Sequence, residues 1–230
     1  MERIIGVVAP AAMGEDPNPR KDVYLFGNNY GNRIYDKGGI PLGILPSDGR
    51  VSEKVLEKMD AFVICGGHKF WPYHLQVVHH AVTTGKPLLG ICLGMQSIYS
   101  YFRAMEYREA TGRYDEDIFV LHQERRARGD SLHRVEGHLM EHLRGREEET
   151  KQPVHLVPGS LIHRLTGKDT IMAGSFHNFV IEQPPAPLTV TGTAPDGTID
   201  VIEYGEKILG VQFHPEIDRE LLPIFDILFQ

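Results

Sequence analysis

Residues 87–96 read PLLGICLGMQ, and this stretch decides the fold. An apolar run of strand length leads into Cys92, and a helical pattern follows, because apolar residues recur at i, i+3, i+4 and i+7 from Ile98. Cys92 is therefore expected in a strand-to-helix turn, where Gly90 and Gly94 leave room for a tight, exposed nucleophile. The N-terminus of the following helix favours a thiolate, since its unpaired N–H groups and its dipole attract negative charge.

Two backbone N–H groups are candidates for binding an oxyanion beside this cysteine. The N–H of Leu93 follows the nucleophile directly and can point toward the developing charge. Residues 60–65, DAFVIC, have the pattern of a strand that ends at a Gly-Gly pair, where backbone N–H groups can approach a substrate closely. We assign the second donor to Gly67, with Gly66 as its neighbour.

A second motif supplies a base. Residues 210–216 read GVQFHPE, so that His214 follows an apolar strand and Pro215 fixes the backbone after it. Glu216 can then fold back onto one imidazole nitrogen, which leaves the other free to take the thiol proton of Cys92. A nucleophile, a base and an orienting carboxylate are what thiol-based acyl transfer requires, so the two motifs together predict a Cys-His-Glu triad.

The remainder of the chain alternates between strand and helix patterns before it becomes richer in strands. The early strands are expected at 4–9, 39–45, 61–65 and 87–91, and the helices between them at 28–37, 51–59 and 73–83. The later strands are expected at 154–157, 170–173, 188–193, 198–204 and 208–213. This order predicts an α/β fold over 1–230 as a single domain, with a three-layer, mostly parallel sheet flanked by helices and a small antiparallel extension.

The two motifs together resemble those of the class I glutamine amidotransferase-like superfamily, and further segments are similar to its peptidase C26 branch. That branch comprises γ-glutamyl hydrolases and includes γ-glutamyl-γ-aminobutyrate hydrolase. The further segments are YGNRIYDKGGIPLGILP at 30–46, AFVICGG at 61–67, VHLVPGSL at 154–161, SFHNF at 175–179 and APDG at 194–197. The resemblance spans nearly the whole chain and implies a flavodoxin-like fold.

The resemblance also implies roles for individual residues. It makes Cys92 the nucleophile, His214 the base and Glu216 the carboxylate that orients the base. It places Gln96 on the helix facing a γ-glutamyl head group and His177 in the pocket wall. Leu93 stands where related hydrolases often carry Arg, and Asn178 and Phe179 stand where they carry a second His and a Gln. These positions shape the pocket, so the identity of the leaving amine stays open.

Three enzymatic functions use this triad. The first is hydrolysis of a small γ-glutamyl amide, such as γ-glutamyl-γ-aminobutyrate, through a γ-glutamyl thioester. The second is a glutaminase subunit that delivers ammonia to a separate synthetase partner, and the third is γ-glutamyl transfer to another amine. We favour hydrolysis, because SFHNF and VPGSL are similar to the hydrolase branch; the intact triad argues against a silent binding domain. None of the three requires a cofactor.

Composition and charge narrow the classes of function and the cellular location that the sequence allows. The net charge of −7 disfavours general binding to nucleic acid or to anionic membranes. The two cysteines, without a disulfide framework, are typical of a reducing compartment, and Cys65, inside an apolar run, is interpreted as structural. No apolar stretch approaches membrane-spanning length and the first residues make a poor signal peptide, so a cytoplasmic location is expected. A homodimer is suggested only by analogy with relatives.

The segment 103–152 is dense in charge and is interpreted as solvated surface helices joined by loops, with a polar lid over the active site as the alternative. Within it, residues 138–142 read HLMEH, which fits a short zinc-peptidase pattern. No further ligand is evident in the sequence, so we expect no metal site.

Overall fold

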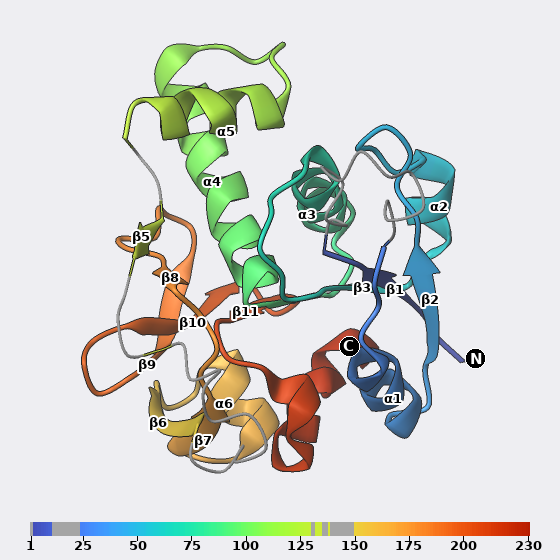
Figure 1. Ribbon diagram of the computed structural model, residues 1–230, viewed down its shortest axis with the longest axis vertical. Coiled ribbons are helices and arrows are strands. Elements are labelled where there is room, and N and C mark those ends of the chain that lie inside the picture. The colour runs from blue at the N-terminus through green and yellow to red at the C-terminus, as the bar shows by residue number, and fades with distance from the viewer. Residues whose placement is uncertain (1, 11–23, 130–131, 135–137, 139–149) are drawn as a thin grey trace, which may run out of the picture.

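The computed structural model describes residues 2–10, 24–129, 132–134, 138 and 150–230 (Figure 1). Its central feature is a nine-stranded sheet in the order β2-β1-β3-β4-β11-β10-β9-β6-β7. The strands of the first half pair in parallel: β1 (Ile4–Val8), β2 (Ile40–Ile44), β3 (Ala61–Ile64), β4 (Leu88–Ile91) and β11 (Ile208–Val211). This is the order of flavodoxin-like sheets, in which ligands bind beyond the carboxyl ends of the strands.

The other half of the sheet is antiparallel and continues from β11. It consists of β10 (Ile199–Tyr204), β9 (Thr189–Thr193), β6 (Lys151–Leu156) and β7 (Thr170–Gly174). A separate two-stranded ladder pairs β5 (His133–Arg134) with β8 (Phe179–Val180). The expected mostly parallel sheet with an antiparallel extension is thus confirmed, and the extension is part of the same sheet.

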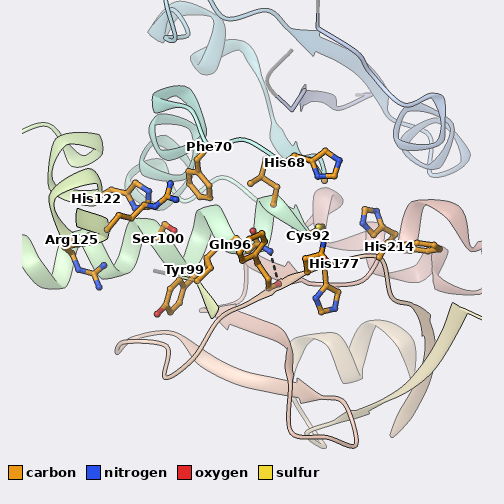
Figure 2. Close-up of a pocket in the computed structure, with 18 residues that line it drawn as sticks. His68, Phe70, Cys92, Gln96, Tyr99, Ser100, His122, Arg125, His177 and His214 are labelled. Atoms are coloured by element: carbon orange, nitrogen blue, oxygen red, sulfur yellow. Dashed lines mark hydrogen bonds between the residues drawn. The ribbon is translucent and has the colours of Figure 1, made fainter. Parts of the chain in front are cut away.

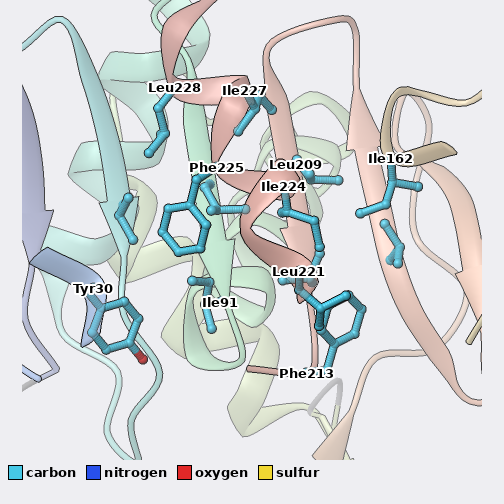
Figure 3. Close-up of a cluster of buried hydrophobic side chains, with 14 of the residues drawn as sticks. Tyr30, Ile91, Ile162, Leu209, Phe213, Leu221, Ile224, Phe225, Ile227 and Leu228 are labelled. Atoms are coloured by element: carbon cyan, nitrogen blue, oxygen red, sulfur yellow. The ribbon is translucent and has the colours of Figure 1, made fainter. Parts of the chain in front are cut away.

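Helices cover both faces of the sheet and enclose two cores. One face carries α1 (Asn28–Asp36), α6 (Leu161–Thr166) and the 3₁₀ segment η5 (Arg219–Phe229), which bury the cluster drawn in Figure 3. The other face carries α2 (Glu53–Lys58), α3 (Pro72–Thr84) and α4 (Leu93–Thr111). In β3, Val63 belongs to the first core and Phe62 to the second, as the period-2 alternation of a strand buried on both faces requires.

The glycines around Cys92 are explained by the close approach of backbone segments. A Cβ on Gly90 would lie 2.6 Å from the backbone of Gly94, and a Cβ on Gly94 would lie 2.3 Å from the carbonyl oxygen of Ile64. Only glycine lets the start of α4 pack this tightly on β3 and β4. The pair therefore fixes where α4 leaves the sheet, and with it the position of Cys92.

The segment 103–152 is only partly described. Its first part is helical, as interpreted, because α4 continues to Thr111 and α5 (Ile118–Ala127) follows it. The interpretation as solvated surface is wrong for one face of α5, which packs on α4 and buries Leu121, His122 and Arg125. Residues 130–131, 135–137 and 139–149 lie outside the described residues, so the lid alternative stays a prediction. Among the described helices, none is both long and apolar enough to cross a bilayer.

Candidate active site

Cys92 sits between β4 and α4 in a strained backbone conformation. Its φ is 53° and its ψ is −103°, a combination that non-glycine residues rarely adopt. Its N–H donates to the carbonyl of Val211 at 2.8 Å, and its own carbonyl accepts from the N–H of Gln96 at 3.1 Å, so both neighbouring elements hold the turn. Cys92 as a whole is 7% exposed and borders the cavity described below.

His214 follows β11 and faces Cys92 at the carboxyl end of the sheet (Figure 2). Its Nδ1 lies 2.7 Å from Oε1 of Glu216, so the carboxylate holds the imidazole from behind. Gly66 packs against both side chains, since a Cβ there would lie 2.6 Å from Cε1 of His214 and 3.4 Å from Cβ of Cys92. The three residues predicted as a triad are thus brought together.

The surroundings of His214 favour its protonated form. Burial opposes the charge of the imidazolium, but the Glu216 carboxylate and the hydrogen bond to Cys92 outweigh it and raise the pKa of His214 well above 6.5. Glu216 is itself buried, and its backbone carbonyl accepts a hydrogen bond from Nε of Arg33 at 3.1 Å. Burial and the same carboxylate raise the pKa of the nearby Tyr30 hydroxyl.

The two glycines predicted near the oxyanion differ in their surroundings. The N–H of Gly66 donates to the Tyr30 hydroxyl at 3.1 Å, so this group already has a partner. Gly67 lies against Leu93, because a Cβ on Gly67 would meet Cδ2 of Leu93 at 3.1 Å. Gly66, Gly67 and Leu93 all line the cavity beside Cys92.

A cavity of about 730 Å³ is lined by Cys92 and His214 at one end and extends along α4 toward α5. Its volume lies within the range of roughly 300–1,000 Å³ that is usual for pockets of drug-sized ligands, which are larger than glutamine. The wall near the cysteine includes Phe176, His177, Asn178 and Phe179 from the segment 175–179. The far wall is formed by α5 and by Phe70.

Gln96 lies one turn along α4 from the cysteine and lines this cavity. Its Nε2 donates to the carbonyl of Phe179 and to Oε1 of Gln212, both at 3.2 Å. The side chain therefore ties α4 to the segment that walls the cavity, in addition to bordering the space where a substrate could bind.

His177 lines the cavity with a neutral imidazole. Burial, with His138 nearby, lowers the pKa of His177 to about 3. Its ring lies 4.8 Å from the ring of His138, which contacts Asp196 at 2.8 Å and the Ser175 hydroxyl at 3.2 Å. Within the described part of the chain, no cluster of His, Cys, Asp or Glu could hold a metal ion; His138 of the HLMEH pattern packs in this polar group, and His142 lies outside the described residues.

Two cavity residues were not singled out from the sequence. His122 and Arg125 belong to α5, inside the segment interpreted as solvated surface, yet both are buried in the cavity wall. Their signal was the helical spacing Ile118, Leu121, His122 and Arg125 at i, i+3, i+4 and i+7, which marks one buried face.

The sequence model of the peptidase C26 family matches residues 71–216, more than half of the chain. The chain belongs to the peptidase C26 family. This match includes Cys92, His214 and Glu216 and agrees with the amide-hydrolase and glutamine amidotransferase-like character expected from the motifs.

Individual relatives of this peptidase C26 protein are distant. Protein NtpR of Enterococcus hirae is 23% identical over 81% of this chain and 79% of its own length. The glutamine amidotransferase-like protein YvdE of Lactococcus lactis is 25% identical over 84% of each. The CTP synthase of Gluconobacter oxydans is 28% identical, but the match spans 74% of this chain and only 34% of the synthase.

The fold of this protein is also found in a solved structure. A glutamine amidotransferase from Thermotoga maritima superposes with a TM-score of 0.60 at 17% identity, covering 98% of this chain and 82% of that one. The likeness extends over the parallel and the antiparallel halves of the sheet and supports the assigned architecture.

Proposed function

We propose that the protein hydrolyses γ-glutamyl amides, with Cys92 as nucleophile, His214 as acid and base, and Glu216 as the residue that orients His214. The observation that carries the proposal is that His214 interacts with both Cys92 and Glu216 beside a cavity larger than glutamine needs. Nucleophile, base and orienting carboxylate are then in reach of one bound substrate.

The reaction proceeds in two steps. The Cys92 thiolate attacks the amide carbon, and the N–H groups of Gly67 and Leu93 stabilise the oxyanion. The imidazolium of His214 gives its proton to the amine nitrogen, the C–N bond breaks, and a γ-glutamyl thioester remains on Cys92. His214 then takes a proton from water as the hydroxide attacks the thioester, and glutamate leaves with the thiolate restored.

The test is release of glutamate from a panel of γ-glutamyl amides that includes glutamine, with Cys92→Ala as the inactive control. We expect γ-glutamyl-amines such as γ-glutamyl-γ-aminobutyrate to be better substrates than glutamine. Added hydroxylamine should intercept the thioester as γ-glutamyl hydroxamate in the wild type alone. If the Cys92→Ala variant releases glutamate at the wild-type rate, the proposal is wrong.

A second function is supported by the similarity to part of CTP synthase. A glutaminase subunit with the same triad would hydrolyse glutamine and pass ammonia to a separate synthetase. Low glutaminase activity that rises when a partner is added would support this function over the first. Transfer of the γ-glutamyl group to another amine uses the same thioester, and would be seen as a new γ-glutamyl product when that amine is supplied.

A further inference from the structure

Helix α1 reaches the candidate active site through its buried face. Its residues Tyr30 and Arg33 lie three positions apart and are both buried, although none of the described α1 residues lines the cavity. The helix packs against the 3₁₀ turn η4 (Pro215–Ile217), which carries Glu216. Side chains of α1 can therefore act on Glu216 from within the protein, without bordering the space in which a substrate would lie.

The Tyr30 hydroxyl accepts a hydrogen bond from the glycine pair beside Cys92. The ring of Tyr30 packs in the first core (Figure 3), and its oxygen accepts from the N–H of Gly66 at 3.1 Å. Gly67, assigned to the oxyanion, follows directly. Glycines have unusual backbone freedom, so an anchored N–H on one of the pair limits where the N–H of the other can point. A tyrosine oxygen that accepts one hydrogen bond can still donate its own proton.

An acceptor for that proton is available on Glu216. Its Oε1 lies 2.7 Å from Nδ1 of His214, whereas Oε2 is buried and has no hydrogen bond of standard geometry within the described part of the chain. Buried acceptors are rarely left without a partner. Burial raises the pKa of Tyr30, and the charge of Glu216 and a hydrogen bond between the two side chains add to the rise. The hydroxyl thus keeps its proton at neutral pH and can donate it.

Arg33 holds the backbone of the same glutamate. Its Nε donates to the Glu216 carbonyl at 3.1 Å, and its Nη1 lies 2.9 Å from Oδ2 of Asp36, which keeps the guanidinium in place. One α1 side chain therefore fixes the main chain of Glu216, while the hydroxyl of Tyr30 is close to its carboxylate.

We propose that Tyr30 is a positioning residue whose single hydroxyl joins the glycine pair 66–67 to the carboxylate of Glu216. The oxygen accepts from Gly66, and the proton is donated to Oε2 of Glu216, which leaves Oε1 facing His214. The inference rests on the proposed hydrolysis of γ-glutamyl amides. It gives α1 a part in that reaction without any contact with substrate.

Tyr30→Phe isolates the hydroxyl, because it removes one oxygen and keeps the ring in the core. On the best γ-glutamyl amide we expect kcat to fall at least about tenfold, since an oxyanion donor and the triad carboxylate both lose their support. KM should stay within about threefold, because Tyr30 does not line the cavity. Tyr35→Phe is the matched control, on the same helix at a position that is 76% exposed. A kcat in Tyr30→Phe equal to that of Tyr35→Phe would overturn the inference.

Alkylation of Cys92 by iodoacetamide at pH 7 tests the link to Glu216 without a substrate, with Cys92→Ala as the blank for Cys65. Without the hydroxyl, the charged carboxylate loses a donor and supports less imidazolium, and hence less thiolate. We expect the alkylation rate to fall about threefold in Tyr30→Phe. In the Glu216→Ala background, where the acceptor is absent, adding Tyr30→Phe should change the rate less than about 1.5-fold. Equal falls in both backgrounds would show that Tyr30 does not act through Glu216.

Comparison of the two rates tests the link to Gly66. Alkylation by iodoacetamide forms no oxyanion, so a displaced glycine pair slows hydrolysis alone. The fall in kcat should therefore exceed the fall in alkylation rate; equal falls would refute the link to Gly66. Thermal unfolding shows whether each variant keeps its fold, and kcat is referred to the fraction of Cys92 that can be alkylated, so that inactive protein is not counted.

The same measurements separate this inference from the proposed function. Alkylation rates that depend on Tyr30 only when Glu216 is present, in a protein that hydrolyses no γ-glutamyl amide, would leave the link to Glu216 standing and refute the hydrolase. Hydrolysis by Tyr30→Phe at the wild-type rate would refute the positioning role alone.

Discussion

Nε2 of His177 lies 4.0 Å from Oδ1 of Asp200, although both side chains are almost completely buried. Neither carboxylate oxygen of Asp200 has a hydrogen bond of standard geometry within the described part of the chain, although the Gln152 side chain lies close enough to lower the pKa of Asp200 slightly. Burial raises the pKa of Asp200 from 3.8 to about 7, with Asp196 adding to the rise and His138 opposing it. The wall behind the cavity therefore contains a carboxyl group that titrates near neutral pH in the folded protein.

The raised pKa gives a prediction for stability against pH. Because the folded protein holds the Asp200 proton more tightly than the unfolded chain, Asp200 destabilises the fold progressively as the pH rises from about 4 to about 7. Asp200→Asn should therefore stabilise the protein more at pH 8.5 than at pH 5, by a difference on the order of 2 kcal/mol at 1.36 kcal/mol per pKa unit. Urea unfolding at both pH values measures this difference. Asp115→Asn, at an exposed position, is the control; equal effects of Asp200→Asn at both pH values would contradict the prediction.

The contact between His214 and Glu216 predicts how the reactivity of Cys92 depends on the carboxylate. Glu216→Gln removes a charge that holds the pKa of His214 high, so that at pH 7 less imidazolium remains to stabilise a thiolate. We expect the rate of Cys92 alkylation by iodoacetamide at pH 7 to fall about tenfold, corresponding to one pKa unit. The exposed Glu220→Gln should leave the rate unchanged. An unaltered rate in Glu216→Gln would show that the carboxylate does not act through His214.

Close packing at Gly94 predicts a large effect from one methyl group. Gly94→Ala would place a Cβ 2.3 Å from the carbonyl oxygen of Ile64, which is backbone and cannot rotate away. We expect a loss of about 1–3 kcal/mol in the free energy of unfolding, as in overpacked cores. Gly31→Ala in α1 is the control, since its Cβ would lie 3.8 Å from the Pro41 side chain and should be neutral or stabilising. Similar results for both variants in chemical denaturation would be inconsistent with this account.

The hydrogen bonds of Gln96 predict a structural contribution that can be separated from any contact with substrate. Gln96→Leu leaves the Phe179 carbonyl and Oε1 of Gln212 without this donor, and we expect it to cost about 1–3 kcal/mol of stability in the absence of substrate. Gln123→Leu on the exposed side of α5 is the comparison. Chemical denaturation without ligand measures this cost. A change of less than about 0.5 kcal/mol in the free energy of unfolding would argue against a structural contribution from these hydrogen bonds.

Most of the fold could be predicted because its local signals agree. The short apolar runs that form β1, β3 and β4 are separated by helical patterns, and Gly90 and Gly94 mark the turn at Cys92 in the sequence itself. The order of the strands in the antiparallel half was not predicted, because pairing there joins β6 to β9 across a long sequence separation that no local pattern encodes.

The residues at the two ends of the cavity differed in how well the sequence predicted their positions. Cys92 and His214 occur in short motifs, in which neighbouring glycines and a proline report on backbone geometry. His122 and Arg125 occur among many charged residues, and composition alone suggested solvent. Their burial is a tertiary effect of α5 packing on α4, and only the helical spacing of their apolar neighbours indicated it.

One continuous helix, α4, begins at the turn that carries Cys92 and forms the cavity floor as far as Ser100. A helix has a fixed rise and rotation per residue, so α4 fixes the distance between the Cys92 sulfur and the far wall of the cavity. Substitutions on α5 can alter the far wall of the cavity without disturbing the backbone at the sulfur. Under the proposed function, substitutions on α5 would therefore change selectivity for the amine while leaving the geometry of Cys92 and His214 intact.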